Sequence, residues 1–427
     1  MSLKHMREAW GLHHNPFPAG AIAGEDSMNS PYNSDIVSAD HDLFMEKLIV
    51  KAVLPPGREF GYLWSQGRHD DTGFGKTTIM LRAALELNAD FGEAVAAEFG
   101  LPEGTKIAAV WASMKTTGVT GIYALLFNSM IYGARRQVTE EPSLVEKCWE
   151  SIATLRSIDM SNIDECTTAI RDEMIATHRR LFPGYPELRE DIIEGLTSGN
   201  LDTLLSRMEQ VTQAGRTRNG LAYFEAFYTL VRAAGVEHLF VFVDQLEDLA
   251  TARNVPRATR QREVGRFRDI FAETAGFRGH CHAVFTFHNR AGQALADFWQ
   301  LERLNPPFWP QDPMGKPATV IVKGVTSISQ VEKLLATYLD SVRANPTGTA
   351  EPFEPSAFQV LLDRCDGRIG QLLPEAYAIL EQAAEVQLPT ISAQFILENM
   401  PAPTDTQPSV DTASDQDTLN ALWKRNE

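Results

Sequence analysis

The chain has 427 residues and a formal net charge of −17, and its hydrophobic and charged fractions are typical of soluble globular proteins. This length exceeds what a single hydrophobic core usually holds, so we expect two or three packed units. The negative charge opposes indiscriminate binding to nucleic acid, although a local basic patch could still bind phosphates.

The cysteines and the apolar runs indicate a cellular compartment. The four cysteines lie far apart and form no Cys-x-x-Cys pair, which argues against a disulfide framework or a zinc ribbon; they are Cys148, Cys166, Cys281 and Cys365. The first twenty residues lack the apolar core of a secretory signal. No apolar run reaches the roughly 18 residues that a membrane span needs. We therefore expect a cytoplasmic protein without a membrane partner.

The chain begins with residues 1–57, which are rich in Pro, Gly, Ser and Asp and are expected to form an arm that wraps a core. Apolar runs typical of buried strands follow at 58–64, 105–113, 238–244, 282–287 and 318–325. Because helical patterns separate these runs, they predict an α/β core over 58–325, with a parallel sheet covered by helices on both faces.

Two further segments are expected to be helical. Residues 114–237 are too long for a single crossover and are interpreted as a helical insertion in the core. Residues 326–400 contain apolar positions at helical spacing in three or four segments, which predict a small all-α domain. The polar, proline-bearing end at 401–427 is expected to be disordered.

The stretch "GRHDDTGFGKTT" (67–78) resembles a phosphate-binding loop, the Walker A motif. Glycines allow backbone N–H groups to converge on anionic oxygens, and the following helix adds a favourable dipole at its N-terminus. The lysine would reach the β and γ phosphates, and the first threonine would ligate Mg²⁺. The candidate nucleotide-binding residues are Gly73, Phe74, Gly75, Lys76, Thr77 and Thr78.

This loop departs from the usual motif at its opening position, where Asp70 replaces a glycine. Gly67 could take over the opening turn and lengthen the loop by three residues. Alternatively, Asp70 and Asp71 could point outward and leave only backbone donors facing the nucleotide. The alternative to a nucleotide site is a glycine-rich segment that merely caps a helix.

A nucleotide site also needs a carboxylate that holds Mg²⁺, and the sequence offers one at the end of an apolar run. In "LFVFVDQLEDL" (239–249), five apolar residues precede Asp244, so its carboxylate emerges from a buried strand. A buried, isolated carboxylate is costly, and a metal ion is a natural partner for it. The alternative is that Asp244 caps the next helix, since Asp is a favoured N-cap residue.

Taken in order over residues 58–400, these features resemble the AAA+ class of P-loop ATPases. Within that class, "GLHHNPFP" (11–18) is similar to the start of ATPases that drive secretion or regulate transposition. The C-terminal helices are similar to the lid of origin-recognition initiators. The segment "VDQLEDL" (243–249) instead resembles the Asp-Gln-x-Glu-Glu box of STAND-type signalling ATPases, including those of bacterial defence systems.

The resemblance implies a P-loop NTPase fold with a C-terminal α-helical lid, binding ATP and Mg²⁺ through Lys76, Thr77 and Asp244. It places a polar sensor at the end of the strand "HAVFTFHN", at Asn289 or, as a second choice, His288. It further implies a homo-oligomeric ATPase whose nucleotide state drives assembly, or remodelling of a DNA or protein partner.

Two departures from the AAA+ pattern bear on hydrolysis and on the lid. Gln245 follows the acid where the class usually has Glu; a neutral amide can orient water but cannot take its proton. Glu247 could serve as the base only if the chain turns it back. In the lid segment "CDGRIGQLL" (365–373), the expected arginine position aligns with Gln371, whereas Arg368 lies three residues earlier. Arg368 is the candidate γ-phosphate contact, and the alternative is a surface arginine in a glycine-flanked turn.

The one dense basic segment, residues 252–273, contains Arg262 and Arg266 four residues apart on one helix face. This face could bind nucleic-acid phosphates or a neighbour's acidic surface, or it could supply an arginine finger in trans. A solvated face with intramolecular ion pairs is the plainer alternative. Arg303 is a second finger candidate, by its position in the class.

Two functional hypotheses remain open besides the assembly ATPase. The first is a slowly hydrolysing, STAND-like ATP switch of the kind found in bacterial defence systems. The second is an ATPase that loads onto DNA. The segment "GHCH" (279–282) pairs His280 and His282 on one strand face, but it offers too few ligands to predict a zinc site.

Overall fold

The computed structural model describes residues 2–20, 38–55, 57–65, 73–114, 121–138, 140–184, 187–246, 249, 256–287, 298 and 318–400. The chain divides into two compact units. The helical unit takes its described residues from Met1–Asp40, Ser65–Lys76 and Val322–Glu427. The α/β unit takes its described residues from His41–Trp64 and Thr77–Ile321.

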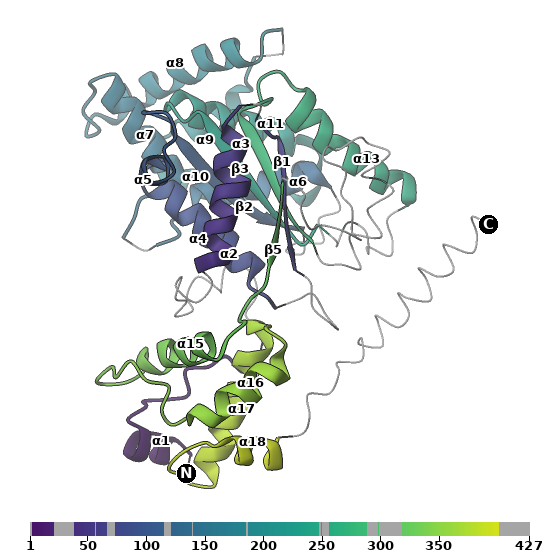
Figure 1. The fold of residues 1–427 in the computed structure, drawn as a ribbon. Helices are drawn as coiled ribbons and strands as arrows, with labels where there is room; N and C mark the ends of the chain where they lie inside the picture. Colours follow the sequence, from purple (N-terminus) through teal and green to yellow (C-terminus); the bar gives the residue numbers. More distant parts are fainter. Residues whose placement is uncertain are drawn as a thin grey trace, which may run out of the picture. The chain divides into compact units, whose positions relative to one another are not determined.

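The α/β unit is built on a five-stranded sheet in which all strands are parallel (Figure 1). Its spatial order is β2-β3-β4-β1-β5, so β4 lies between β1 and β3. This confirms the predicted α/β fold with a parallel sheet, and each predicted apolar run overlaps one strand. The strands are β1 Phe60–Ser65, β2 Ile107–Ser113, β3 His238–Asp244, β4 Cys281–Phe287 and β5 Thr319–Val322.

Helices pack on both faces of this sheet, which is why its strands are mostly apolar. On one face, Phe44 of α2 (Ser38–Phe44) stacks edge-on against Phe242 of β3. Figure 1 shows α2 and α3 as one helical run in front of the strands, joined by η3. On the other face, Phe267 of α13 contacts Phe285 of β4. The bounds of the connecting elements are η3 Met45–Val50, α3 Lys51–Val53, α13 Arg257–Arg268 and η5 Asp269–Glu273.

Between β1 and β2 the described chain forms α4 Lys76–Ala89 and α5 Glu93–Glu98. Between β2 and β3 it forms α6 Ile122–Ala134, α7 Leu144–Leu155, α8 Ile163–Leu181, α9 Glu190–Leu196, α10 Leu201–Glu209 and α11 Gln213–Ala233. Side-chain oxygens cap the N-termini of four of these helices and satisfy backbone donors there. The capping residues are Ser143, Asn162, Asn200 and Thr212.

The helical unit contains α1 Ser2–Trp10, α15 Ile328–Asp340, α16 Pro355–Cys365, α17 Ile369–Glu385 and α18 Ala393–Asn399. The N-terminal segment is part of its core, where Met6, Leu12 and Phe17 are buried. The ring of Phe17 stacks on Tyr338 at 5.8 Å between ring centroids.

The arm expected at 1–57 is therefore divided in the structure. Its first part completes the helical unit, and residues 38–53 form helices whose later part packs on the sheet of the α/β unit. The buried apolar residues of the first part are too irregularly spaced to form a helical or strand pattern, so the sequence does not reveal their packing. Among the described residues, no helix combines the length and apolar character that a membrane span requires.

Helices α6 and α11 pack with direct backbone contact at Gly220. A Cβ built on this residue would lie 2.0 Å from the carbonyl oxygen of Tyr123, so any larger residue must separate the helices. We predict that Gly220→Ala lowers the free energy of unfolding by about 1–3 kcal/mol, as expected for overpacking. Gly195→Ala is the matched control, because its Cβ would make an ordinary 3.6 Å contact with Leu204. Urea unfolding of both variants gives the comparison, and equal stability of the two would contradict the packing described.

The half-buried His238 at the start of β3 and the buried His282 near the start of β4 form a hydrogen-bonded chain. His282 Nδ1 lies 2.6 Å from the carbonyl oxygen of Arg58, so this nitrogen carries the proton and donates. Its Nε2 then accepts from His238 Nδ1 at 3.1 Å. Burial lowers the pKa of His238 to about 3 and that of His282 to about 4. Both rings are therefore neutral at pH 7. Separately, the described residues contain no cluster of three or more His, Cys, Asp or Glu that could bind a metal.

This pair should make the protein sensitive to acid. In the unfolded chain a histidine takes up its proton near pH 6.5. The folded state does so only near pH 4 and pH 3, so the free energy of unfolding falls as pH falls below about 6.5. We predict that His238→Phe reduces the difference in unfolding free energy between about pH 7.5 and about pH 5. The exposed His14, changed to Phe, should leave that difference at the wild-type value.

Candidate functional site

The carboxylate of Asp244 lies at the carboxyl end of β3 and is only 3% exposed. Its Oδ2 accepts a hydrogen bond of 2.6 Å from Thr77 Oγ1. Its Oδ1 accepts one of 2.6 Å from Thr286 Oγ1 and one of 3.0 Å from the backbone N–H of Gln245. Both carboxylate oxygens therefore have donors, which is what a buried acid requires.

The sheet topology brings these residues together although they are far apart in the chain. Ser113, the last residue of β2, pairs in register with Asp244, the last residue of β3. Thr286 is the next-to-last residue of β4, the neighbouring strand. Thr77 is the second residue of α4 and lies 167 positions from Asp244 in sequence. Because parallel strands end at the same edge of a sheet, threonine hydroxyls from α4 and β4 reach one carboxylate, and the Ser113 hydroxyl of β2 bonds to the side chain of the next residue, Gln245.

Gln245, directly after the acid, has a left-handed backbone with φ +55°. A residue other than Gly, Asn or Asp pays about 1 kcal/mol or more for this conformation. Its backbone N–H also lies 3.0 Å from Thr286 Oγ1, and its side-chain Oε1 accepts from Ser113 Oγ at 2.8 Å. These bonds hold the strained residue in place. The amide oxygen of Gln245 is thereby engaged, and the described residues provide no hydrogen-bond partner for its Nε2.

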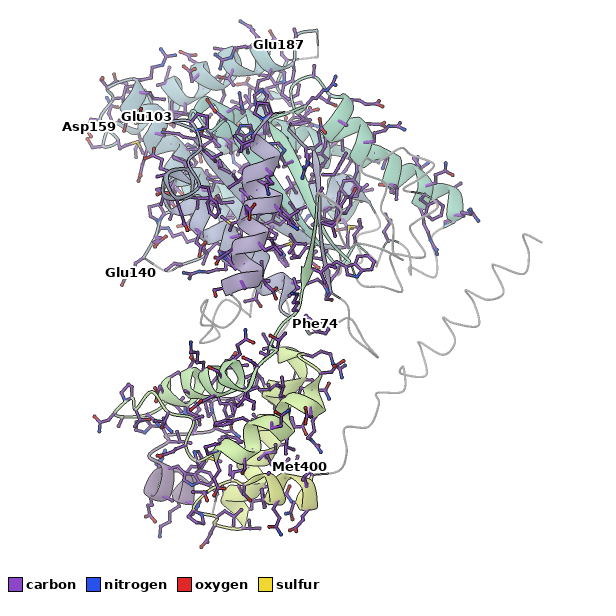
Figure 2. The ribbon with its side chains drawn as sticks, viewed as in Figure 1. Phe74, Glu103, Glu140, Asp159, Glu187 and Met400 are labelled. Carbon is purple, nitrogen blue, oxygen red and sulfur yellow. The ribbon has the colours of Figure 1, made fainter. Side chains whose placement is uncertain are left out.

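The glycine turn before α4 belongs to the helical unit. Gly73 has φ +80° and Gly75 has φ +92°, conformations that favour glycine. The side chain of Phe74 between them, labelled in Figure 2, is 3% exposed. A Cβ built on Gly324 would lie 3.2 Å from this ring, so the ring packs against a glycine backbone. The sequence predicts Phe74 as a nucleotide contact; with its ring buried, only its backbone is suited to that role.

A backbone hydrogen bond fixes the same turn to α17. The N–H of Gly370 donates to the carbonyl oxygen of Gly73 at 2.8 Å, and a Cβ built on Gly370 would lie only 2.9 Å from Gly73 Cα. Arg368, the N-cap residue of α17, lies two positions before Gly370, and its Nε donates to the carbonyl oxygen of Cys365 at 3.3 Å. Gln371 is in the first turn of α17, and its buried Oε1 has no hydrogen-bond partner among the described residues.

Lys76 is the first residue of α4, and its Nζ donates to Ser65 Oγ, the last residue of β1, at 2.5 Å. Thr78 follows in the first turn of α4 and is half-buried. The first backbone N–H groups of a helix have no partner within the helix and carry a partial positive charge. The start of α4 therefore offers an ammonium group, two hydroxyl groups and helix N–H donors from consecutive residues.

The arginines of α13 divide into paired and exposed ones. Arg266 donates to Glu263 at 2.5 Å and lies 4.4 Å from the centroid of the Tyr123 ring. Glu263 is itself buried and accepts the N–H of Ile122 at the start of α6. Arg266 thus helps to hold α13 against α6. Arg262 has a 63% exposed side chain and lies 3.9 Å from Glu263.

Several residues predicted from the sequence lie outside the described residues. These are Glu247, Asn289, His288, Arg303 and the loop 67–72 with Gly67, Asp70 and Asp71. Among the rest, the structure brings Thr77, Asp244 and Gln245 together in one hydrogen-bonded group.

Sequence reasoning missed three hydroxyl residues at strand ends: Ser65, Ser113 and Thr286. The available signal was a hydroxyl residue at or next to the end of an apolar run. A buried hydroxyl at such a position needs a partner, and the carboxyl edge of a parallel sheet is where ligands bind in α/β folds.

Comparison with known proteins identifies no relative. No protein-family model matches the sequence, and no curated protein is significantly similar to it. A functional assignment for this chain therefore rests on its motifs and on the geometry of the hydroxyl and carboxylate groups at the sheet edge.

Proposed function

We propose that this protein binds ATP with Mg²⁺ and acts as a P-loop ATPase of AAA+ type, whose nucleotide state controls its assembly or the remodelling of a DNA or protein partner. The observation that carries the proposal is the 2.6 Å contact between Thr77 Oγ1 and Asp244 Oδ2. The first residue follows the lysine of a glycine-rich loop, and the second ends a buried strand. These are the hydroxyl and the acid that a nucleotide-bound Mg²⁺ needs.

The donor set fits magnesium. Mg²⁺ prefers hard oxygen ligands and is usually held by one or two protein groups, with waters and substrate phosphates completing its coordination. Thr77 and Asp244 supply two such oxygens side by side. A cluster of three or more acidic or imidazole ligands is not required. When bound, the metal would neutralise charge on the β and γ phosphates.

The residues before Thr77 fit a polyphosphate. The positive φ angles of Gly73 and Gly75 turn the backbone sharply before α4, and the ring of Phe74 between them is buried. Lys76 then presents an ammonium group at the helix start, where anions are favoured. Its hydrogen bond to Ser65 would be exchanged for phosphate oxygens on binding.

A slowly hydrolysing ATP switch is the second candidate, and Gln245 favours it. Its side-chain oxygen accepts from Ser113, so the amide offers N–H donors and no group able to take a proton from water. With Gln245 beside Asp244, the site would bind the triphosphate well and cleave it slowly, unless Glu247 supplies the general base.

The proposal also includes binding partners of the protein. The resemblance to AAA+ proteins supports a homo-oligomer, with Arg303 as a candidate trans arginine. Arg262 is an exposed arginine of α13 and is suited to meet phosphates or an acidic neighbour, whereas Arg266 is committed to Glu263 and Tyr123.

Replacing Lys76 tests the nucleotide site. We predict that Lys76→Ala abolishes ATP binding, because the ammonium is the one positive side chain of the loop segment 73–78. For wild-type protein, ATP at about 100 times its Kd should raise the free energy of unfolding by about 2.7 kcal/mol, a shift that the variant should lose. Thermal unfolding with and without MgATP measures this effect.

Lys106→Ala is the matched control, because Lys106 precedes the amino end of β2 and takes no part in the site. It should keep the full ATP-induced shift. A Lys76→Ala protein with unchanged ATP affinity would refute the nucleotide site.

Exchanging Gln245 distinguishes the switch from the fast ATPase. We predict that Gln245→Glu raises the steady-state rate of phosphate release by about 100-fold, the lower range for a general base, because a carboxylate can still accept from Ser113. Gln245→Ala is the control and should not accelerate hydrolysis. If wild-type hydrolysis is already fast and Glu247→Gln abolishes it, the switch hypothesis is wrong.

A further inference from the structure

Thr286 is a buried residue whose side chain is hydrogen-bonded to Asp244, the proposed magnesium ligand. It is 1% exposed and lies on β4, between the strand that leads to the glycine loop and the strand that ends in Asp244. Its hydroxyl oxygen is 2.6 Å from Asp244 Oδ1 and 3.0 Å from the backbone nitrogen of Gln245.

The direction of both hydrogen bonds follows from the chemistry of the groups. An ionised carboxylate only accepts and a backbone N–H only donates. The hydroxyl of Thr286 therefore gives its hydrogen to Asp244 and accepts from Gln245. Neither bond can be reversed, so the hydroxyl rotor is fixed, and it ties the carboxylate to the backbone of the next residue.

This arrangement fixes which oxygen of Asp244 lies beside the Thr77 hydroxyl. Oδ1 receives the donors from Thr286 and Gln245, and Oδ2 is the oxygen that contacts Thr77. Rotation of the carboxylate would break the two bonds to Oδ1. The left-handed backbone of Gln245 depends on the same hydroxyl, since its N–H points to Thr286.

We propose that Thr286 is a positioning residue for magnesium binding: it holds Asp244 so that Oδ2, beside the Thr77 hydroxyl, faces the metal. The inference rests on the proposed ATP site and adds a residue that no part of the phosphate-loop motif contains. Partners that orient metal ligands typically contribute about 10- to 100-fold to metal affinity.

A purely structural role makes a different prediction. If Thr286 only satisfied a buried acid, its loss would lower the melting temperature and leave the metal dependence of ATP binding unchanged. If it positions the carboxylate, its loss weakens ATP binding in the presence of Mg²⁺ and has little effect when Mg²⁺ is absent. The two roles therefore predict different values for the ratio of ATP affinity in Mg²⁺ to ATP affinity without Mg²⁺.

The experiment compares ATP binding in EDTA and in Mg²⁺ for wild type, Thr286→Val and Thr286→Ser, using full-length protein and a fluorescent ATP analogue. Thr286→Val keeps the shape of the side chain and removes the hydroxyl. We expect its gain in affinity on adding Mg²⁺ to fall about 10- to 100-fold below that of wild type. The affinity in EDTA should stay within about twofold, and Thr286→Ser should restore the wild-type gain.

Thr229→Val controls for the loss of a buried threonine hydroxyl elsewhere. Thr229 is fully buried in α11, and its hydroxyl bonds to the carbonyl oxygen of Glu225 in its own helix. This variant should keep the wild-type response to Mg²⁺. If Thr286→Val does not fold, Thr286→Cys replaces it, because the thiol is similar in size and a weak donor.

The outcomes separate the two proposals. A Thr286→Val protein with the full wild-type gain from Mg²⁺ overturns the positioning role, while loss of binding in Lys76→Ala would still support the ATP site. A wild-type protein that does not bind ATP in either buffer overturns the ATP site, and the role of Thr286 with it.

Discussion

Burial of the Asp244 carboxylate is the constraint around which the sheet edge is organised. A charge removed from water is unstable unless donors or a cation surround it. Here two threonine hydroxyls and one backbone N–H point at its two oxygens. Removing any of them leaves part of the charge uncompensated. These donors lie on α4, on β4 and in the turn after β3. Their hydrogen bonds fix the carboxylate, and the carboxylate in turn fixes the position of these three elements.

The parallel sheet makes this grouping possible without long loops. All five strands end at the same edge, so residues 113, 244 and 286 meet there although they are far apart in sequence. The position of β4 beside β3 explains why Thr286, rather than a residue of β1, reaches Oδ1 of Asp244. The same edge receives the start of α4 with Thr77. Strand order thus determines which hydroxyls can serve the carboxylate.

The sequence predicted the strands well because continuous apolar runs are a strong signal of buried parallel strands. It assigned Thr77 and Asp244 to one candidate site because both belong to motifs, and the structure joins their side chains by a hydrogen bond. Thr286 and Ser113 were not predicted, since one hydroxyl near the end of an apolar run has no periodicity and its partner is remote in sequence. The packing of Met6, Leu12 and Phe17 in the helical unit was missed for a similar reason. Their partners lie more than 300 residues away, and no local pattern connects them. Contacts set by tertiary structure are the part that a pattern cannot supply.

The glycine turn and Gln245 each have a feature that would favour retention of nucleotide in the proposed ATP site. In the helical unit, the backbone of Gly73 is bonded to Gly370 and the ring of Phe74 is buried against Gly324, so the turn is supported on two sides. A turn held in this way is ordered before a ligand binds, which reduces the entropy lost on binding. Beside the acid, Gln245 presents an amide oriented by Ser113, which can donate to a phosphate oxygen but cannot activate water. In the proposed ATP site, an ordered turn combined with weak activation of water would lengthen the lifetime of a bound triphosphate, which is what a nucleotide-controlled assembly requires.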